Sequence, residues 1–572
     1  MAPKVNAPSQ FSDAALQHRL ELVGGAKGAG MSALMKSLRV FAVACFACLG
    51  GLLYGYNQGV FSGILVMPAF ERYMGDWVGN GTKIGWLTSI LELGAWTGTM
   101  YSGFLAEIIS RKYAIIVNTA IFILGVVIQC TAVSAGHSAI LGGRFIVGLG
   151  VGSLSMIVPM YVAECSPPEL RGFMIAIQQF AIEFGIMISF WIDYGCNYIG
   201  GTGETQSKTA WLLPLALQFI PAVILLVGMS FMPFTPRWLA HHGREAEAKK
   251  TLAMLRSLPE DHELVELEFM EIKAQSLFEK RTTQEKFPHL ADQSWSSTIK
   301  LQFVAIGSLF RTKPMFRRVV VATVTMFFQQ WTGINAILYY APIIFKNGLG
   351  LSGNTTNLLA TGVVGIVMLL ATIPSMIYID RIGRRPALAL GALGMAFSHF
   401  TVAIIYAKNE NQWPTHQAAG WAAIVMVWLF VVHFGWSWGP CAWIVVAEVW
   451  PLSARPYGIA LGASSNWMNN FIVGQVTVDM IDGIRYGTFI LFGCLITLGA
   501  AFVWFIVPET KQLTLEEMDI VFGSSGVAAA DQERMDQINR EVGLVSAAPG
   551  GRVTPSSEKP EAETVLAEKQ GA

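Results

Sequence analysis

Uncharged amide side chains interrupt several of the most apolar stretches of this 572-residue chain. They are Gln178, Gln179, Gln329, Gln330, Asn335, Asn466 and Asn470. An amide both donates and accepts hydrogen bonds, and it is cheaper to remove from water than an ion. The set therefore suits a ligand that is dense in hydroxyl groups, such as a polyol. For any single member, the alternative is a hydrogen bond that holds neighbouring helices together.

Three of these amides lie close together in the sequence. On an ideal helix Gln329 and Gln330 point about 100° apart, and Asn335 aligns with neither of them. Gly333, which follows Thr332, allows a local break that re-aims these side chains. We therefore predict a discontinuous helix at this point.

Ionisable side chains also fall inside apolar stretches: Glu92, Arg144 and Glu183. A charge inside a membrane is costly, so such residues usually pair with one another or serve a proton or ligand site. Each carboxylate is compatible with a proton site, with pairing to Arg144 or with a structural role, and the sequence leaves these alternatives open.

The elements that must position these residues are membrane helices. Only 14% of the residues are charged and the mean hydropathy is +0.48, whereas soluble proteins carry roughly 25% charged residues. A bilayer core about 30 Å thick needs about 20 apolar residues per helix, and about twelve such stretches are present. They cover about 40–66, 84–106, 113–133, 139–163, 173–193, 210–232, 318–345, 357–379, 387–407, 419–446, 457–480 and 486–507.

One long charged segment, residues 233–317, divides these stretches into six and six. We therefore predict an all-α membrane protein with two six-helix halves. Its parts are an N-terminal tail over 1–39, bundles over 40–232 and 318–507, a helical linker over 233–317 and a mostly disordered tail over 508–572. Within the linker, charge and periodicity predict helices over 245–258 and 263–277.

Basic residues at the borders of the tail and linker indicate that both termini and the linker lie in the cytoplasm. Residues 1–39 hold no apolar core of signal-peptide type, so we expect the first apolar stretch to remain as a membrane anchor. Two N-x-T sequons, at Asn80 and Asn354, fall in loops that this topology assigns to the outside, where glycosylation occurs.

The two halves repeat three charged signatures. Residues 103–112 correspond to 380–385, the pair Glu164 and Arg171 to Glu448 and Arg455, and residues 233–239 to 508–511. These repeats predict two homologous bundles, which are typical of transporters that rock around a site near the bilayer midplane.

The repeated charges lie where the inner helix ends of the two halves meet. Opposite charges there pair only when the ends approach, so we expect a cytoplasmic latch that holds the outward-open form. Its members are Arg111, Glu164, Arg171, Asp380, Arg381, Arg384, Arg385, Glu448 and Arg455. The alternative is that these residues only mark the cytoplasmic interface of the membrane.

Residues 40–522 resemble the sugar porter family of the major facilitator superfamily, of the fungal hexose and pentose transporter type. The resemblance rests on residues 143–152, 159–164, 171–172, 236–239, 329–335, 380–385 and 508–511. It implies alternating-access transport of a monosaccharide such as glucose or xylose across the plasma membrane, without a cofactor.

The resemblance also implies roles for individual residues. Gln179, Gln329, Gln330, Asn335 and Asn470 match positions that bind sugar hydroxyls, and Trp443 and Trp467 match aromatic residues beside the sugar ring. Tyr339 and Tyr340 resemble the outer gate, and Gly439 with Pro440 resembles a hinge in the tenth span. For the tryptophans, the alternative is anchoring at the membrane interface.

The chain departs from the family pattern at several positions. Asn57 stands where proton-coupled porters carry an Asp, and an amide does not cycle a proton, so facilitated diffusion is favoured. Proton symport through Glu92 or Glu183 is the alternative. Met368 replaces an Asn that contacts sugar, which predicts an altered preference among sugars. Glu107 is among the changes that predict a weaker first-half latch.

Other classes of function have less support. The 39 basic and 39 acidic residues give zero net charge, which excludes a nucleic-acid surface, and the residues show no enzyme or metal-site pattern. A sugar sensor, or a porter of a disaccharide, polyol or quinate-like acid, remains open. We expect a monomer in the lipid bilayer whose partners are a small sugar and, in a symporter, protons.

Overall fold

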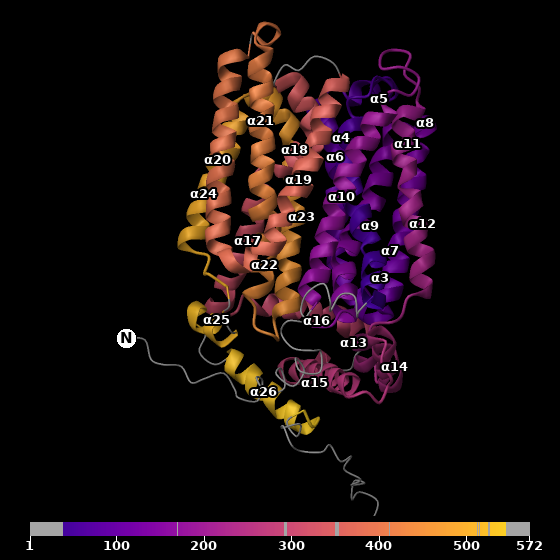
Figure 1. The fold of residues 1–572 in the computed structure, drawn as a ribbon, viewed down its shortest axis with the longest axis vertical. Coiled ribbons are helices and arrows are strands. Elements are labelled where there is room, and N and C mark those ends of the chain that lie inside the picture. The colour runs from indigo at the N-terminus through magenta and orange to yellow at the C-terminus, as the bar shows by residue number, and fades with distance from the viewer. Residues whose placement is uncertain are drawn as a thin grey trace, which may run out of the picture.

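The computed structural model describes residues 38–168, 170–290, 294–348, 354–410, 412–511, 513, 515–523 and 527–544. Within these ranges every regular element is helical. Long helices run side by side in one bundle, with shorter helices gathered at one end (Figure 1). We call that end, which carries α13 (Pro236–His241), α14 (Glu245–Arg256) and α15 (Glu263–Lys286), the linker end, and the opposite end the loop end.

The first half of the bundle contains six crossings. Their helices are α3 (Leu38–Ala47) with α4 (Leu49–Ile64), α6 (Gly81–Ile109), α7 (Arg111–Cys130), α9 (His137–Cys165), α10 (Arg171–Cys196), and α11 (Thr209–Leu217) with α12 (Phe219–Phe231). Short helices α5 (Pro68–Met74), η2 (Gly75–Trp77) and α8 (Ala132–Ala135) lie at the loop end.

The second half also contains six crossings, and two of them are not regular α-helices throughout. The helices are α17 (Lys313–Gln330) with α18 (Ile334–Ile343), α19 (Asn354–Ile382), α20 (Arg384–Asn409), α21 (Gln417–His433) with α22 (Gly439–Glu448), α23 (Arg455–Ile484) and α24 (Gly487–Phe505). Between α21 and α22 the helix widens to a π-helical stretch, η6 (Phe434–Trp438), directly before Gly439 and Pro440. A second π-helical stretch of the same length, η4 (Ile344–Gly348), follows α18.

Nine helices of the described ranges are long and apolar enough to cross a membrane by themselves. The remaining crossings are α6, the α17–α18 pair and α23, and these three carry most of the candidate polar site, including Glu92, Gln330, Asn335 and Asn470. Each of the twelve expected spans is helical over most of its length.

Close helix packing in the first half depends on glycine. A Cβ on Gly148 of α9 would lie 2.1 Å from the carbonyl oxygen of Leu91 in α6, and one on Gly152 would lie 2.0 Å from that of Ala95. Only glycine allows the two backbones to approach this closely. The glycine-rich string at 143–152 therefore sets the distance between α6 and α9, and with it the position of Glu92 and Arg144.

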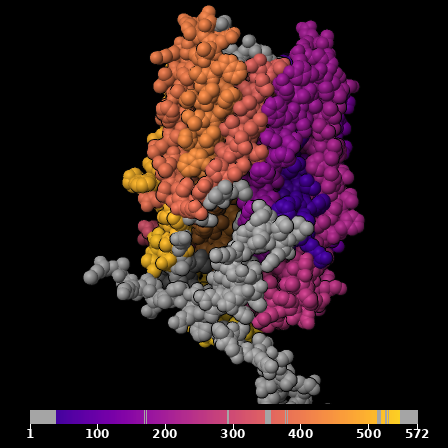
Figure 2. Space-filling model, in the orientation of Figure 1, coloured from indigo at the N-terminus to yellow at the C-terminus, as the bar shows by residue number. Residues whose placement is uncertain are grey.

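The two halves meet along α6 and α23 and along α10 and α19. At the loop end, Thr82 Oγ1 donates a 2.8 Å hydrogen bond to Asp479 Oδ2, and Ser89 Oγ donates one of 2.9 Å to Gln475 Oε1. Gly362 of α19 packs against Trp191 of α10. The halves, purple and orange in Figure 2, are thus closed against each other at the loop end.

The linker helices pack on the first half. Trp238 Nε1 donates a 2.8 Å hydrogen bond to the carbonyl oxygen of Glu107, and Arg256 Nη1 donates one of 3.0 Å to that of Cys165. The sequence predicted both long linker helices, but α15 continues to Lys286, nine residues past the expected end. Two further short elements, η3 (Pro288–Leu290) and α16 (Trp295–Ser308), lead to α17.

The C-terminal region is more ordered than expected. After α25 (Leu515–Phe522), a second helix, α26 (Val527–Glu541), lies along α15 (Figure 1). Ile538 is fully buried against Ala274 and Phe278 of α15. The sequence did not predict α26, because most of its residues are polar and its apolar face is stabilised only by contact with α15.

Candidate functional site

The seventh crossing is broken at residues 331–333, as its sequence predicted. α17 ends at Gln330, and α18 begins after Gly333, whose φ of +88° is a left-handed value that favours glycine. The break lets Asn335 Nδ2 donate a hydrogen bond to Gln330 Oε1. Two of the three predicted amides therefore meet at the break.

Gln329 turns in a different direction. Its Nε2 donates to the carbonyl oxygens of Trp438 (2.8 Å) and Gly439 (3.1 Å), and its Oε1 accepts a 2.6 Å hydrogen bond from Asn466 Nδ2. It thus bridges α17 to the irregular stretch of the tenth crossing, at the junction of η6 and α22. In this conformation Gln329 fastens helices together, which is the alternative role for an intramembrane amide.

A second polar cluster joins the two halves. Glu92 of α6 is 1% exposed and accepts hydrogen bonds from Tyr339 Oη (2.8 Å, to Oε1) and Asn470 Nδ2 (3.1 Å, to Oε2). The Tyr339 hydroxyl also lies 3.0 Å from Asn470 Oδ1. One carboxylate of the first half therefore holds a proposed gate residue and a proposed sugar-binding residue of the second half.

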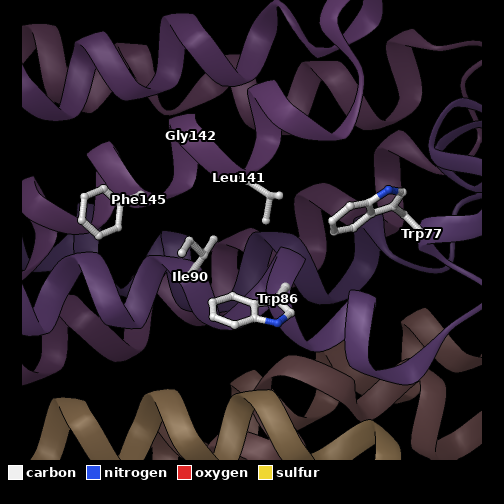
Figure 3. A pocket seen from close by; sticks show the side chains of 6 residues that line it. All are labelled: Trp77, Trp86, Ile90, Leu141, Gly142 and Phe145. Carbon is white, nitrogen blue, oxygen red and sulfur yellow. The ribbon is translucent and has the colours of Figure 1, made fainter.

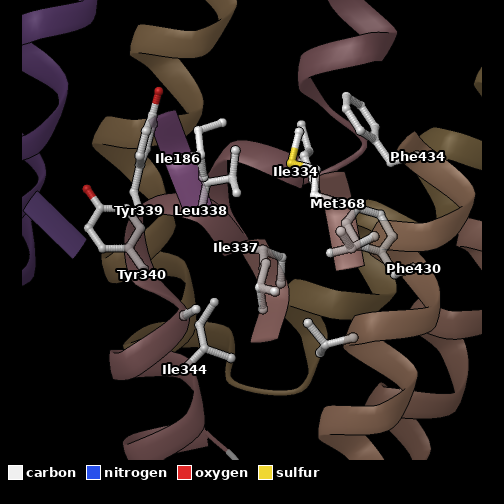
Figure 4. Packing of buried hydrophobic residues seen from close by; sticks show 14 of the residues in the cluster. Ile186, Ile334, Ile337, Leu338, Tyr339, Tyr340, Ile344, Met368, Phe430 and Phe434 are labelled. Atoms are coloured by element: carbon white, nitrogen blue, oxygen red, sulfur yellow. The ribbon is translucent and has the colours of Figure 1, made fainter. Parts of the chain in front are cut away.

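Tyr340 lies beside the same contact between the halves. Its hydroxyl donates a 2.6 Å hydrogen bond to the carbonyl oxygen of Gly474 in its own half, and it also interacts with the side chain of Thr88 in the first half. Figure 4 shows the hydroxyl groups of Tyr339 and Tyr340 on the side away from Phe430 and Phe434. Met368 lies on the apolar side, among buried aliphatic and aromatic residues.

Arg144 is buried beside this cluster. Its Nη2 donates a 2.9 Å hydrogen bond to the carbonyl oxygen of Thr88, and its guanidinium group lies 4.1 Å from the ring centre of Phe61. Nε and Nη1 have no hydrogen-bond partner among the described residues. Asn57 Nδ2 donates to Leu53 O of its own helix at 2.9 Å, so in this conformation its amide serves α4 and not Arg144.

The fifth crossing carries the other predicted carboxylate. Gln179 Nε2 donates a 3.1 Å hydrogen bond to Glu183 Oε1, while Glu183 Oε2 has no partner among the described residues. Glu183 is 1% exposed. Sequence reasoning missed a second buried carboxylate in this helix, Asp193, which lies against Gly63 of α4; its place at the predicted end of the span was the available signal.

The two candidate ring-stacking tryptophans differ in their surroundings. Trp467 of α23 is 1% exposed, and its ring centre lies 5.2 Å from that of Tyr54 in α4, so it contacts the opposite half. Trp443 of α22 is only partly buried. Both lie inside their helices rather than at helix ends, which argues against simple interfacial anchoring.

The charges at the linker end pair within each half. Arg111 binds Glu164 (3.1 Å) and Glu107 (2.8 Å), and Arg384 binds Glu448 (2.9 Å). Each arginine begins a helix and binds the glutamate near the end of another, so the internal duplication is visible in the contacts. No ion pair among the described side chains joins the predicted latch residues of one half to those of the other.

The remaining latch residues have different surroundings. Glu509 accepts hydrogen bonds from the backbone N–H groups of Arg384 and Arg385, both at 3.0 Å, and Lys511 Nζ donates one of 2.7 Å to the carbonyl oxygen of Arg381. Arg455 lies near Glu448. The side chains of Arg171 and Asp380 lie outside the described part of the structure.

Electrostatics favour the ionised form of Glu107 at the linker end. Burial alone would raise the pKa of its carboxyl group, but the charges of Arg111 and His241 outweigh burial and lower this pKa. The predicted weak point of the first-half latch thus carries a carboxylate that is held ionised.

Of the two sequons, Asn80 is exposed at the loop end, where its side chain caps α6 by accepting a 3.1 Å hydrogen bond from Lys83 N. The side chain of Asn354 lies outside the described residues.

A cavity of about 500 Å³ lies in the first half and is lined by Trp77, Trp86, Ile90, Leu141, Gly142 and Phe145 (Figure 3). Its lining is apolar and contains none of the predicted site residues.

Comparisons with known proteins agree with this architecture. The family model described as sugar (and other) transporter matches residues 43–522. A probable quinate permease of Aspergillus fumigatus is 32% identical over 498 residues, which are 86% of this chain and 88% of that protein. A quinate permease of Neurospora africana is 30% identical over 515 residues, which are 88% of this chain and 92% of that protein.

Solved structures of the xylose transporter XylE from E. coli have the same fold. A partially occluded inward-open form superposes with a TM-score of 0.67 at 25% identity and covers 84% of this chain and 100% of that chain. A form bound to 6-bromo-6-deoxy-D-glucose, titled as a proton:xylose symporter of the major facilitator superfamily, superposes with a TM-score of 0.67 at 26% identity, covering 85% and 100%. The chain belongs to the sugar (and other) transporter family and is a multi-pass membrane transporter.

Proposed function

We propose that this transporter carries a neutral monosaccharide, a hexose or a pentose such as glucose or xylose, by alternating access. The observation that carries the proposal is the helix break at Gly333, which turns Gln330 and Asn335 toward each other inside the bundle. Their amides are hydrogen-bonded to each other, and exchanging this bond for hydrogen bonds to cargo hydroxyls would cost little net free energy. Asn470 and Trp467 of α23 would complete the site, with the tryptophan facing the C–H side of a sugar ring.

Transport is proposed to be facilitated diffusion. Asn57 stands where proton-coupled relatives carry an acid, and its amide is engaged by Leu53 of its own helix. An amide at this position neither binds nor releases a proton. A substrate gradient alone would then drive uptake.

Proton symport is the alternative, and Glu92 and Glu183 are its candidate sites. Glu92 supports it because the carboxylate bonds to both Tyr339 and Asn470, so a change in its protonation would alter contacts between the halves. Glu183 is buried, interacts with Gln179 of its own helix and with Thr372 of the opposite half, and could likewise couple protonation to the contact between the halves. The XylE structures, one of which is titled as a proton:xylose symporter, are consistent with this second mode.

A second cargo is a quinate-like acid. It is favoured by the quinate permeases at 30–32% identity and by Arg144, whose Nε and Nη1 have no hydrogen-bond partner among the described residues; an anionic cargo requires such a cation. Glu92 opposes it whenever its carboxyl group is ionised, because a carboxylate in the same site repels an anion. The balance favours a neutral cargo.

One experiment separates these alternatives. Uptake of radiolabelled glucose, xylose and quinate is measured in yeast that lacks its own hexose transporters, across external pH and with and without a protonophore. We expect saturable sugar uptake that survives the protonophore. Uptake that collapses with the protonophore contradicts facilitated diffusion. The variants Glu92→Gln and Glu183→Gln then identify the proton site, because only the variant without the proton-binding carboxylate becomes insensitive to the protonophore. Uptake of quinate without uptake of sugar overturns the proposal of a neutral cargo.

The topology is proposed from charge and sequons. We infer a monomer in the plasma membrane with bundles over 40–232 and 318–507, and with the linker over 233–317, the tails 1–39 and 508–572 and both termini in the cytoplasm. The pairs of Arg111 with Glu164 and Arg384 with Glu448 would exchange partners between the halves when the linker ends approach. Glycosylation at the exposed Asn80, detected by a mobility shift after glycosidase treatment, tests this orientation.

A further inference from the structure

The segment that leads from the linker into the seventh crossing exposes large aromatic side chains. It consists of α16, the turn that follows it and the first turn of α17. Trp295 is 68% exposed and Phe303 is 64% exposed, and Phe310 and Phe316 are about half exposed. Four aromatic rings on one short segment next to a membrane helix need an apolar environment or an interface.

The same segment is strongly basic. The sequence contains no Asp or Glu between Asp292 and Asp380, whereas residues 300–318 contain five basic residues. One of them, Arg318, is buried and pairs with Asp519. The other four, Lys300, Arg311, Lys313 and Arg317, are exposed, and none of them forms an ion pair with a carboxylate of the described residues.

The neighbouring linker helices show a different pattern. Lys249 pairs with Glu266, and Lys273 pairs with Glu245 at 2.9 Å, so those cations are neutralised locally. The positive charge of 295–317 is not compensated in this way. The segment is therefore suited to bind an anion from outside the protein, and its four exposed rings need an apolar environment.

The position of α16 turns its exposed side away from the bundle. Gln302 packs against Gly103 near the linker end of α6, and Ala305 and Leu309 are buried. α17 begins at Lys313, where the chain enters the bundle. The cations and rings thus lie at the level where the membrane core ends, with the rings at the headgroup boundary.

We propose that residues 295–317 form an interfacial binding site for anionic phospholipid headgroups in the leaflet at the linker end. Lys300, Arg311, Lys313 and Arg317 bind the headgroup phosphates and carboxylates, and the four exposed rings insert beside the acyl chains. The site is separate from the transport pathway and does not depend on the cargo.

The test uses the purified full-length protein reconstituted in vesicles of phosphatidylcholine mixed with phosphatidylserine. Native mass spectrometry after mild detergent extraction counts the retained lipids of each kind. The test variant is K300Q/R311Q/K313Q/R317Q. The matched control, K249Q/K250Q/K273Q/K280Q, removes the same number of charges from α14 and α15.

We expect the wild-type protein and the control to retain phosphatidylserine in preference to phosphatidylcholine. In the test variant this preference should fall by about tenfold or more, since four cations near the membrane surface are lost. Added salt should reduce the wild-type preference in the same direction.

Equal preference in the wild type and the test variant overturns the proposal, and so does an equal loss in the control. If the test variant fails to purify as a monodisperse protein, the wild-type protein alone tests the proposal. The proposal is then overturned if the wild type shows no preference for phosphatidylserine at low salt, or if added salt leaves that preference unchanged.

Discussion

The hydroxyl oxygen of Tyr339 lies 2.8 Å from Oε1 of Glu92, and this hydrogen bond joins the second half of the transporter to the first. The other carboxylate oxygen of Glu92 binds Asn470, so a single buried side chain contacts two helices of the opposite half. Opening of the loop end must separate α6 from α18 and α23, and these bonds then break. Their loss sets part of the free-energy difference between the two transport states.

Removal of the Tyr339 hydroxyl should favour the form that is open at the loop end. Y339F loses a hydrogen bond to a carboxylate, which contributes about 1.5–3 kcal/mol, so the ratio of the two forms should shift by about tenfold or more. Electron spin resonance distances between labels at the exposed Tyr73 and Tyr486, with the native cysteines replaced, report this ratio.

The control for this change is Y101F, because the Tyr101 hydroxyl bonds to Asn118 (2.7 Å) and to the carbonyl oxygen of Leu149 (3.2 Å), both in its own half. We expect Y101F to leave the distance distribution close to that of the wild type. An equal shift in both variants would show that the Glu92 bond is not what holds the loop end closed.

Replacement of Met368 by asparagine should change the preference among sugars. Met368 is 6% exposed and lies in an apolar cluster, so an amide there is unsatisfied unless a cargo hydroxyl pairs with it. The ratio of xylose to glucose uptake should change in M368N but not in M395N, which places the same amide at a fully buried position of α20. An unchanged ratio in M368N would remove Met368 from the selectivity determinants.

A side chain at Gly148 should prevent close packing of the first half. In G148V the new Cβ would meet the backbone of α6, and helix separation at a tightly packed contact should lower the free energy of unfolding by about 2 kcal/mol or more. Thermal unfolding in detergent measures the loss. G142A, on the same helix but with open space around its Cβ, should unfold at the wild-type temperature or slightly above it, because alanine favours the helix; an equal loss there would contradict the packing argument.

The linker-end pair of Glu107 with Arg111 should stabilise the protein only above acid pH. Because the pKa of Glu107 is lower in the folded state, its contribution is fully present above the ordinary pKa of a carboxyl group and disappears as the pH falls through the lowered value. The difference in unfolding temperature between wild type and E107Q should therefore be largest near neutral pH and vanish in acid. E260Q, at an exposed position, should leave the unfolding temperature at the wild-type value.

Substitution of Ile538 should release the C-terminal helix. Ile538 is fully buried between α26 and α15, and an aspartate there would bury a charge without a partner. I538D should expose Arg534 and Arg540 to trypsin, with cleavage at least about tenfold faster than in the wild type. The exposed control E533Q should be cleaved at the wild-type rate, and slow cleavage of I538D would contradict the docking of α26.

The sequence alone was sufficient for the class of the protein, its two halves and most of its helices. A stretch of about 20 apolar residues predicts a membrane-spanning helix whatever it packs against, and the repeated charged signatures indicate that the two halves are duplicated. The break at Gly333 was also predictable, because glycine marks a backbone conformation that other residues avoid. Each of these properties depends on residues that are close together in the chain, and so it can be predicted from the sequence.

The tertiary structure alone decided which polar groups meet. Rotation of a helix determines whether Gln329 faces the site or Trp438, and the relative position of the halves determines that Glu92 meets Tyr339 and Asn470. The same holds for the pairing of Arg111 and Arg384 within their own halves and for the docking of α26 on α15. Such contacts depend on distances between segments that are far apart in the chain, which no local pattern of residues encodes.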